Sequence, residues 1–447
     1  MSVDKLPARI AKLDTEINLQ TEILKRVEHD ESLAEPQLNE IHGLKEPPED
    51  LKLERDSSLF QCILDPITRL PLEISSEIFL QSLPPFPEGM YESCPHHIPR
   101  LLLSICNAWT NIALSTPGLW SAIHILLPCS KGLKEILPIW LERARNQPLS
   151  ISLQVEGWFD ADVLDIIWQR GPQLKYLQLY EMHRMENNDI LKVACPGPLP
   201  SLETLVTRSQ LGWHLNPPQI LYLLRQTPNL VEYFINTRIG RLENTGDDMV
   251  HPKLRRLTFG EHGICPDRGT RLLRRLSLPS LEVLSIATSS DVLLSFLRRS
   301  VPPLLELTLR TRRDAMDFVA LAECAPDLSR LEVWYPEPLA VENLLAALET
   351  QSLLPRLDTL VLHLDRHYLP GNGDAFWPAL LRALAARRTH VRVFRLTVLG
   401  RLPASQLPPP RIRAAIRELG TDGMQVSISA TEGRWTSLLG SVDTDTD

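Results

Sequence analysis

Several short motifs that would indicate enzyme chemistry are missing from this 447-residue sequence. It contains no G-x-S-x-G, no P-loop and no G-x-G-x-x-G. These motifs position a serine nucleophile or hold phosphate groups, so their absence argues against the enzymes that depend on them. Nothing in the sequence supplies a convincing nucleophile–base pair either. We therefore expect a protein that is not an enzyme, with no catalytic residues and no cofactor.

Cysteine is scarce and irregularly spaced. The seven cysteines form no C-x-x-C pair, which argues against a zinc site and a disulfide framework, and favours reduced thiols. They are Cys62, Cys94, Cys106, Cys129, Cys195, Cys265 and Cys324. Cys94-Pro-His96-His97 lacks a second ligand pair and is expected to lie in a surface loop. His363 and His367 are expected to be structural, so no metal site is predicted.

Long hydrophobic runs and a strong charge of either sign are also missing. No apolar run approaches the ~18 residues of a membrane span, and the N-terminal residues lack the apolar core of a secretory signal. The formal net charge of −8 argues against a general nucleic-acid binder. The sequence thus predicts a protein of the cytoplasm, the nucleus or both, with no membrane and no nucleic acid among its partners.

Apolar residues at alternating steps of three and four characterise residues 3–27. This spacing predicts an amphipathic helix within residues 1–42 and is typical of a coiled-coil seam. The helix could pack on its own chain, or it could form a weak homodimer, since fewer than four heptads are marginal. Residues 43–65 carry Pro47-Pro48 and many charges, and are expected to form a linker and a lead-in helix.

Residues 66–127 show the pattern of a small all-α domain. Pro71 stands where a first helix begins, because a proline in the first turn loses no needed hydrogen bond. Apolar residues at helical spacing predict one second helix over residues 101–113. Ser115-Thr116-Pro117 is expected to end that helix, with Ser115 or Thr116 capping a third, short one. The third helix is expected to carry Leu119, Trp120 and Ile123, with Trp120 mostly in the core.

A unit of the form P-x-L-x-x-L-x-L recurs within residues 148–400. Its first apolar position falls at Leu174, Leu202, Leu230, Leu254, Leu281, Leu304, Leu328, Leu357 and Val393, in steps of 23 to 36 residues. A period in the middle twenties with an L-x-x-L-x-L core is typical of leucine-rich repeats. Each unit predicts a strand and the stretches between them predict helices, so stacked units build a parallel sheet.

The predicted fold class is α/β. An N-terminal helix and the small all-α domain precede an irregular leucine-rich-repeat solenoid over residues 128–402, with a curved parallel sheet and outer helices. The irregularity is expected because the asparagine ladder of regular solenoids is missing. The segment SISLQV, with Ile151 and Leu153, predicts an additional first strand. Residues 403–447 are expected to form a C-terminal cap, with GMQVSISA as a capping strand, and a disordered acidic tail.

Residues 66–127 resemble an F-box. The resemblance rests on Leu70-Pro71 followed by Glu73, on Ile78-Phe79 in the first helix, and on Cys106-x-x-Trp109 in the second. The Ser-Thr-Pro-Gly-Leu-Trp sequence that follows is typical of F-boxes in fungal proteins with a coiled N-terminus and a leucine-rich C-terminus. The resemblance implies that the domain docks on a Skp-type adaptor and thereby joins a cullin scaffold.

The same resemblance implies that the repeats recruit a protein substrate, so that the chain is the substrate-recognition adaptor of an SCF-type ubiquitin ligase. It implies adaptor-binding residues at Leu70, Pro71, Glu73, Ile74, Ile78, Phe79, Leu102, Ile105, Cys106 and Trp109. The alternative is a leucine-rich-repeat interaction scaffold without a ligase role, in which these helices pack only internally.

Substrate binding is expected on the concave side of the sheet. In an L-x-x-L-x-L strand the leucines face the core and the residues between them face the concave side, where solenoids usually bind partners. The candidates for substrate binding are Tyr176, Tyr180, Arg208, Arg256, Arg310 and Trp334. The same face is expected to carry Gln178, Thr204, Glu232, Asn236, Thr258, Glu306, Arg330, Glu332 and His363.

Positive charge is concentrated in residues 253–313, which contain twelve Lys/Arg and five Asp/Glu. One interpretation is that an acidic or phosphorylated peptide docks on Arg256 and Arg310. In the other interpretation the charges are solvated on outer helix faces. The arginines concerned in that case are Arg274, Arg275, Arg298 and Arg299.

Overall fold

The structure is a computed structural model that describes most of residues 66–437. The described residues are 66–84, 86, 97–127, 132–155, 161–181, 197–209, 214–215, 217–239, 248–260, 272–310, 316–350, 353–365, 375–400, 407–421, 423–431 and 435–437. The predicted helix of residues 1–42, the segment of residues 43–65, Cys94-Pro-His96 and the acidic tail lie outside them. The chain divides into two compact units, residues 1–201 and residues 202–447.

The first unit opens with short helices, as predicted. The 3₁₀ helix η3 (Pro66–Arg69) leads into α3 (Leu72–Gln81), and Pro71 stands directly before the first residue of α3. Two α-helices and a second 3₁₀ helix follow: α4 (His97–Ile105), α5 (Asn107–Ser115) and η4 (Pro117–Trp120). Because α5 contacts both α3 and α4, these elements form one helical cluster.

The single helix predicted over residues 101–113 is in fact two helices. Cys106 has an extended backbone (φ −164°, ψ 166°) and separates α4 from α5. The hydroxyl of Thr110 lies 3.0 Å from the Leu103 carbonyl and 3.1 Å from that of Cys106, so its single hydrogen is shared between these two acceptors at the break. The apolar spacing continues through Cys106, which is why periodicity alone does not reveal the break.

Two further details of residues 66–127 differ from the prediction. Thr116 occupies the cap position of η4, but its hydroxyl donates back to the Ile112 carbonyl at 2.7 Å instead of capping η4. Residues 122–127 form a strand, β1 (Ala122–Leu127), so the segment is not all-α and Ile123 is not helical. The alternating isoleucines of β1 favour a strand, and the pairing of β1 with the following strand is more favourable than a longer helix.

Three parallel strands complete the described part of the first unit. β1 pairs with β2 (Leu149–Val155), and β2 pairs with β3 (Leu174–Glu181). The strand predicted from SISLQV is therefore confirmed as β2. The connections carry the helices α6 (Leu133–Ala144), α7 (Ala161–Gln169) and η5 (Gly171–Gln173).

Trp120 joins the helical cluster to α6, and its predicted place in the core is confirmed. The side chain is fully buried, and its indole nitrogen donates to the Ala113 carbonyl at 2.9 Å. The Trp140 ring packs edge-on against it at 4.8 Å between centroids, and the Trp140 indole donates to the Trp120 carbonyl. Arg143 adds a guanidinium 4.6 Å from the centroid of the Trp120 ring.

The second unit is built on an open sheet, which confirms the predicted α/β class with a large parallel sheet. Nine of its described strands run parallel, and neighbours in the sheet are neighbours in the repeat pattern. They are β4 (Thr204–Ser209), β6 (Glu232–Asn236), β9 (Arg256–Phe259), β11 (Val283–Ile286), β12 (Glu306–Arg310), β13 (Arg330–Trp334), β14 (Thr359–Asp365), β15 (Val393–Leu399) and β16 (Gln425–Thr431). β16 coincides with most of GMQVSISA and so confirms the strand predicted there. β17 (Trp435–Ser437) is antiparallel to β16.

The repeat pattern explains where these strands begin. Each strand from β4 to β14 starts four residues after the proline of its unit, as Pro228 and Glu232 illustrate. The first leucine of each unit is almost completely buried, for example Leu230 and Leu328. Burying one leucine is worth ~1.5–3 kcal/mol, so the repeated leucines build one continuous core.

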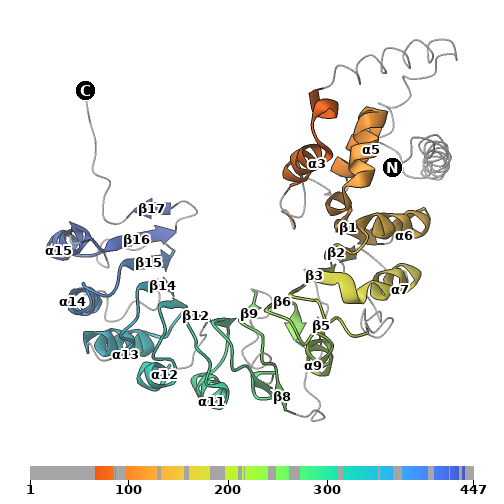
Figure 1. The fold of residues 1–447 in the computed structure, drawn as a ribbon. Helices are drawn as coiled ribbons and strands as arrows, with labels where there is room; N and C mark the ends of the chain where they lie inside the picture. The colour runs from red at the N-terminus through yellow and green to blue at the C-terminus, as the bar shows by residue number, and fades with distance from the viewer. Residues whose placement is uncertain are drawn as a thin grey trace, which may run out of the picture. The chain divides into compact units, whose positions relative to one another are not determined.

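Helices lie along the outer side of this curved sheet, as Figure 1 shows for α11 to α15. The described helices are α9 (Pro217–Gln226), α11 (Ser290–Ser300), α12 (Phe318–Cys324), α13 (Pro338–Glu349), α14 (Phe376–Ala386) and α15 (Pro410–Thr421). From α11 onward each helix contacts the next. We call the opposite side of the sheet, which faces away from these helices, the concave face.

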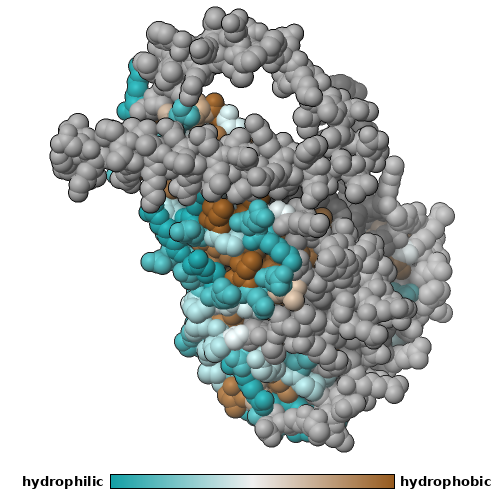
Figure 2. Space-filling model, turned by 90° about the vertical axis from the view of Figure 1, so that its right-hand side faces the viewer, coloured by the Kyte–Doolittle hydropathy of each residue, from teal (hydrophilic) through white to brown (hydrophobic). Residues whose placement is uncertain are grey.

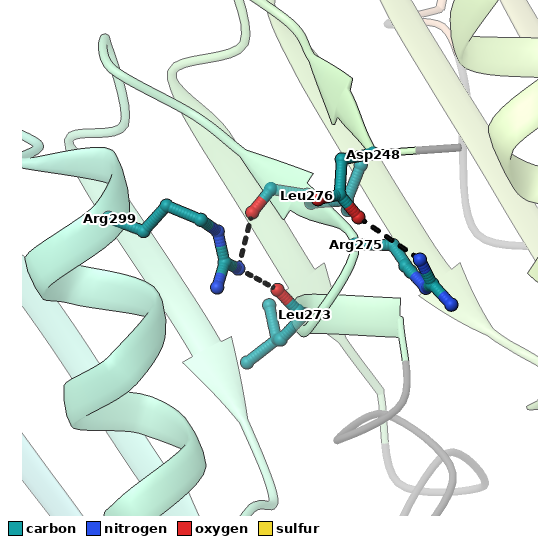
Figure 3. A network of polar contacts seen from close by, with 5 residues as sticks. All are labelled: Asp248, Leu273, Arg275, Leu276 and Arg299. Carbon is teal, nitrogen blue, oxygen red and sulfur yellow. Dashed lines mark hydrogen bonds and ion pairs between the residues drawn. The ribbon is translucent and has the colours of Figure 1, made fainter. Parts of the chain in front are cut away.

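Two pairs of short strands and an arginine contact accompany the main sheet of the second unit. β8 (Met249–Val250) pairs with β10 (Leu276–Ser277), and β5 (His214–Leu215) pairs with β7 (Arg238–Ile239). Arg299 of α11 donates to the carbonyls of Leu273 and Leu276, the latter at 2.7 Å (Figure 3).

The outer arginines account for much of the positive segment. Arg275 pairs with Asp248 at 3.3 Å (Figure 3), and Arg274, Arg298 and Arg299 are exposed. Arg298 and Arg299 lie on the outer helix α11, as expected, but Arg274 and Arg275 lie in a turn and not on a helix face. Arg310 lies on the sheet itself.

Candidate functional site

Exposed apolar side chains are concentrated on the helical cluster. Among the described residues, six of the fourteen exposed large hydrophobic side chains lie between residues 70 and 105. They are Leu70, Leu72, Ile74, Ile78, Leu101 and Ile105. On the side of the molecule drawn in Figure 2, hydrophobic patches lie among hydrophilic side chains. Such concentration on a small helical element is typical of a surface that another protein covers.

The exposed residues are arranged in pairs along two helices. Ile74 and Ile78 are 50% and 42% exposed on α3, and Leu101 and Ile105 are 60% and 47% exposed on α4. Each pair is separated by four residues, so its members lie on the same face of their helix. We call these four residues the helix surface.

Several predicted adaptor-binding residues do lie at the surface. Leu70, Pro71, Glu73, Ile74, Ile78 and Ile105 are exposed. Cys106 and Trp109 are partly buried. The Trp109 ring lies 4.9 Å from that of Phe79, so it holds α5 against α3 while keeping part of its area accessible.

Phe79 and Leu102 do not fit the prediction. Phe79 is 2% exposed and Leu102 is 5% exposed, so both belong to the core of the helical cluster and offer a partner no surface. The sequence prediction also omitted Leu72 and Leu101, which are exposed. Phe79, Leu102, Leu72 and Leu101 are all large hydrophobic residues. Which of them are exposed to solvent depends on how the three helices pack.

On the concave face, parallel pairing without a register shift arranges side chains in rows across the strands. One row contains Arg310, Trp334 and His363, since Arg310 of β12 pairs with Trp334 of β13, and Trp334 pairs with His363 of β14. The Trp334 and His363 rings are stacked, with centroids 3.6 Å apart and planes inclined by 17°. The Arg310 guanidinium lies 5.7 Å from the Trp334 ring centroid, within reach of a cation–π interaction.

Glu332 fixes the position of this row. Its carboxylate accepts a hydrogen bond from Arg330 at 2.8 Å and another from the Trp334 indole at 2.8 Å, and His363 Nε2 lies 3.4 Å away. The hydrogen bond from His363, followed by those from Arg330 and Trp334, lowers the pKa of Glu332 to about 2 against the opposing effect of burial. The carboxylate is therefore charged at any physiological pH. We call Arg310, Arg330, Glu332, Trp334 and His363 the Trp334 cluster.

The backbone directly after Trp334 is strained. Tyr335 has a positive φ of 53°, and its amide donates to the His363 carbonyl at 2.8 Å. A non-glycine residue in the left-handed region costs of order 1–3 kcal/mol and persists where the surroundings hold it. This strain is located directly beside the Trp334 cluster.

A second arginine lies over an aromatic ring on the concave face. The Arg208 guanidinium is 5.0 Å from the ring centroid of Phe234, on the neighbouring strand β6. Arg256 is exposed on β9, as predicted. Of these four candidates Arg256 is exposed, whereas Arg208, Arg310 and Trp334 are half-buried.

The two tyrosine candidates behave differently. Tyr176 is partly buried, donates to Gln178 at 2.9 Å, and meets the Phe86 ring edge-on at 5.5 Å. Tyr180 and Gln178 are buried, at 2% and 3% exposed, so the prediction that they face solvent is wrong. Their face of β3 is covered, in part by Phe86, which alternation along the strand does not reveal.

The described residues contain no group of three His, Cys, Asp or Glu side chains that could hold a metal ion. Nor does any described helix combine the length and the apolar character needed to cross a membrane. Comparison of the sequence with protein-family models gives no match, and comparison with curated proteins gives none either.

Proposed function

We propose that this chain is the substrate-recognition subunit of a cullin–RING ubiquitin ligase of the SCF type. The helical cluster docks on a Skp-type adaptor, and the repeats, as a leucine-rich-repeat array, recruit a protein substrate. The observation that carries the proposal is the helix surface, on which four large aliphatic side chains are about half exposed in two i, i+4 pairs.

The helix surface has the chemistry of a protein interface. Exposed isoleucine and leucine side chains on two short helices of the helical cluster gain hydrophobic free energy when a partner covers them, at ~25 cal/mol per Å². An apolar helix face is also a common docking element for other helices. The F-box resemblance of Leu70-Pro71 and Cys106-x-x-Trp109 supports a Skp-type adaptor as that partner.

The second unit supplies a different kind of surface. Its concave face combines arginines, a tryptophan and a histidine within the Trp334 cluster, and Trp and Arg are frequent anchors of protein interfaces. A surface that is rich in such side chains and separate from the helix surface fits a protein that binds two partners. It fits the alternative scaffold function equally well, so support for the ligase function comes from the helix surface and not from the concave face.

A charge placed on the helix surface tests the proposal. In cells that express the tagged full-length chain, Ile74→Glu and Leu101→Glu should each reduce recovery of a Skp-type adaptor, and of the cullin with it, by tenfold or more. Both positions are half exposed, so the substitutions leave the core intact. Leu339→Glu is the matched control, because Leu339 is similarly exposed but lies on α13 of the second unit.

The proposal predicts that the unaltered chain and the Leu339→Glu variant recover adaptor and cullin equally. Failure of the unaltered chain to recover any adaptor at adequate expression contradicts the ligase function and leaves the interaction scaffold. Circular dichroism of the purified variants shows whether a lost interaction reflects the surface or a loss of folding.

A further inference from the structure

An arginine of the Trp334 cluster carries a hydrogen-bond donor without an acceptor. Nη1 of Arg310 is shielded from solvent, and the structure provides it with no hydrogen-bond partner. An unsatisfied donor that has left water is unfavourable, and more so on a charged group. By contrast, Arg330 in the same cluster is paired with Glu332. The guanidinium of Arg310 is therefore the unsatisfied charge of the cluster.

The geometry around Arg310 is suited to an anion that offers two oxygen atoms side by side. A guanidinium holds its five N–H donors in one plane, in a fixed geometry. These N–H groups form a fork that matches the two oxygens of a carboxylate or two oxygens of a phosphate. Trp334 cannot turn away, because its indole is held by Glu332 and its ring is stacked on His363.

The charges of the cluster distinguish between these two anions. Arg330 and the ionised Glu332 offset each other, which leaves Arg310 as the arginine of the cluster whose charge has no ion-pair partner there. A carboxylate carries one negative charge and balances Arg310. A phosphate monoester carries about −1.5 to −2 at neutral pH and would meet Glu332 on the adjacent strand without a second free cation.

We propose that the Trp334 cluster binds a carboxylate of an extended peptide segment, with Arg310 as its ligand and Trp334 as the platform that orients Arg310. The inference rests on the proposed function to the extent that the peptide belongs to the recruited substrate. The carboxylate comes from an Asp or Glu side chain or from a chain terminus, and the test separates these sources.

Peptide selection on the purified full-length chain provides the test. Peptides are selected from one random library displayed internally and from another that ends in a free C-terminus. We expect enrichment of Asp and Glu if a side chain binds, or enrichment only in the second library if a terminus binds. The best peptide is then synthesised with Glu, Gln, Ser or phosphoserine at the enriched position, or with an amidated end, and its dissociation constant is measured.

Removal of either charge should weaken binding by about tenfold or more. Exchange of Glu for Gln in the peptide and Arg310→Gln in the protein should each have this effect. The two substitutions together should weaken binding little more than either alone. Arg310→Lys should bind with intermediate affinity, because the charge remains and the fork is lost. Arg298→Gln removes the same charge from the outer helix α11 and should bind like the unaltered chain.

Three outcomes would overturn the proposal. These are selection of no peptide, equal affinity for Arg310→Gln and Arg298→Gln, and tighter binding of the phosphoserine peptide than of the Glu peptide. Peptide binding by the purified chain does not involve the adaptor. Loss of adaptor recovery with retained Glu-peptide binding would therefore contradict the ligase function alone.

Discussion

Arg387 shows how one buried charge can organise the repeats. Its side chain is almost completely buried, and its guanidinium donates to the carbonyls of Leu348, Thr350 and Leu354 at 2.9, 2.7 and 3.3 Å, and also to that of Leu353. These carbonyls lie at the end of α13 and just beyond it, where a helix leaves acceptors unsatisfied. Arg387 thus caps α13 from the end of α14.

Replacement of this cap should be costly. Arg387→Met keeps the length of the side chain but leaves several buried carbonyls without a donor, so we expect a loss of about 3 kcal/mol or more in the free energy of unfolding. Urea denaturation measures it. Arg388→Met, at the exposed neighbouring position, should stay within about 0.5 kcal/mol of the unaltered chain. Equal midpoints for the two variants would contradict the capping role.

Glu332 should make stability depend on pH in one direction. The folded state lowers its pKa from 4.5 to about 2, so the stabilisation is complete above about pH 5 and is lost as the pH falls towards 2. Glu332→Gln removes this contribution. We therefore expect the unaltered chain to exceed the variant in stability at about pH 6, and this difference to shrink at about pH 3.

Urea titrations at the two pH values check this prediction, since other carboxylates affect both proteins alike. A difference that stays constant between about pH 6 and about pH 3 would show that the pKa of Glu332 is not lowered on folding.

At the scale of elements, the end of α11 combines an unfavourable residue with a left-handed backbone. Val301 has φ 44° and ψ 53°, and its amide donates to the Leu297 carbonyl at 2.8 Å. Helices often end in this conformation, but glycine usually provides it, because a β-branched side chain is strained there. Val301 is 76% exposed, so its side chain contributes little packing in return.

Val301→Gly should consequently stabilise the protein by about 1 kcal/mol, as measured by its thermal midpoint. Val319→Gly is a control of opposite sign, because Val319 is exposed within α12, where glycine is less favourable than valine by roughly 0.3–0.5 kcal/mol. If both substitutions destabilise the protein, the left-handed strain at Val301 is not significant.

The strands were predictable because the same signal occurs many times. A proline followed by leucines at fixed positions marks β4 to β14, and a repeated pattern outweighs the ambiguity of any single short segment. The extended residue Cys106 inside an apparently continuous helix was not predictable. It depends on hydrogen bonds such as those of Thr110, which the apolar spacing does not encode.

The candidate sites were predictable only in part, for a related reason. Strand alternation places Trp334, Glu332 and His363 on one face, as expected. On a short helix, however, Ile78 and Phe79 are adjacent and equally hydrophobic, yet one is exposed and the other is buried. Which of the two faces the core depends on contacts with Trp109 on α5, and sequence spacing does not contain that information.

At the scale of the whole molecule, the two proposed surfaces belong to different units, and their functions should be separable. Ile74→Glu should reduce recovery of the adaptor and leave binding of the selected peptide unchanged. Trp334→Ala should weaken peptide binding about tenfold and leave adaptor recovery unchanged, because truncation of an interface tryptophan commonly costs more than 1 kcal/mol.

Adaptor recovery is measured in cells that express each tagged full-length variant, and peptide binding is measured on the same variant after purification. Loss of both interactions in the Trp334→Ala variant, with an unchanged circular dichroism spectrum, would contradict the assignment of one partner to each unit.

The parallel register of the concave face also limits how a bound chain can be recognised. Within one row, neighbouring side chains are separated by the strand spacing of ~4.8 Å. Alternate residues of an extended peptide are separated by ~6.8 Å. For a peptide that crosses the strands, the side-chain positions of the peptide and of a row therefore coincide only once in about seven strands. A short bound peptide can therefore match the spacing of the repeats at only one position. One preorganised cluster, rather than the whole sheet, then sets which sequences are accepted.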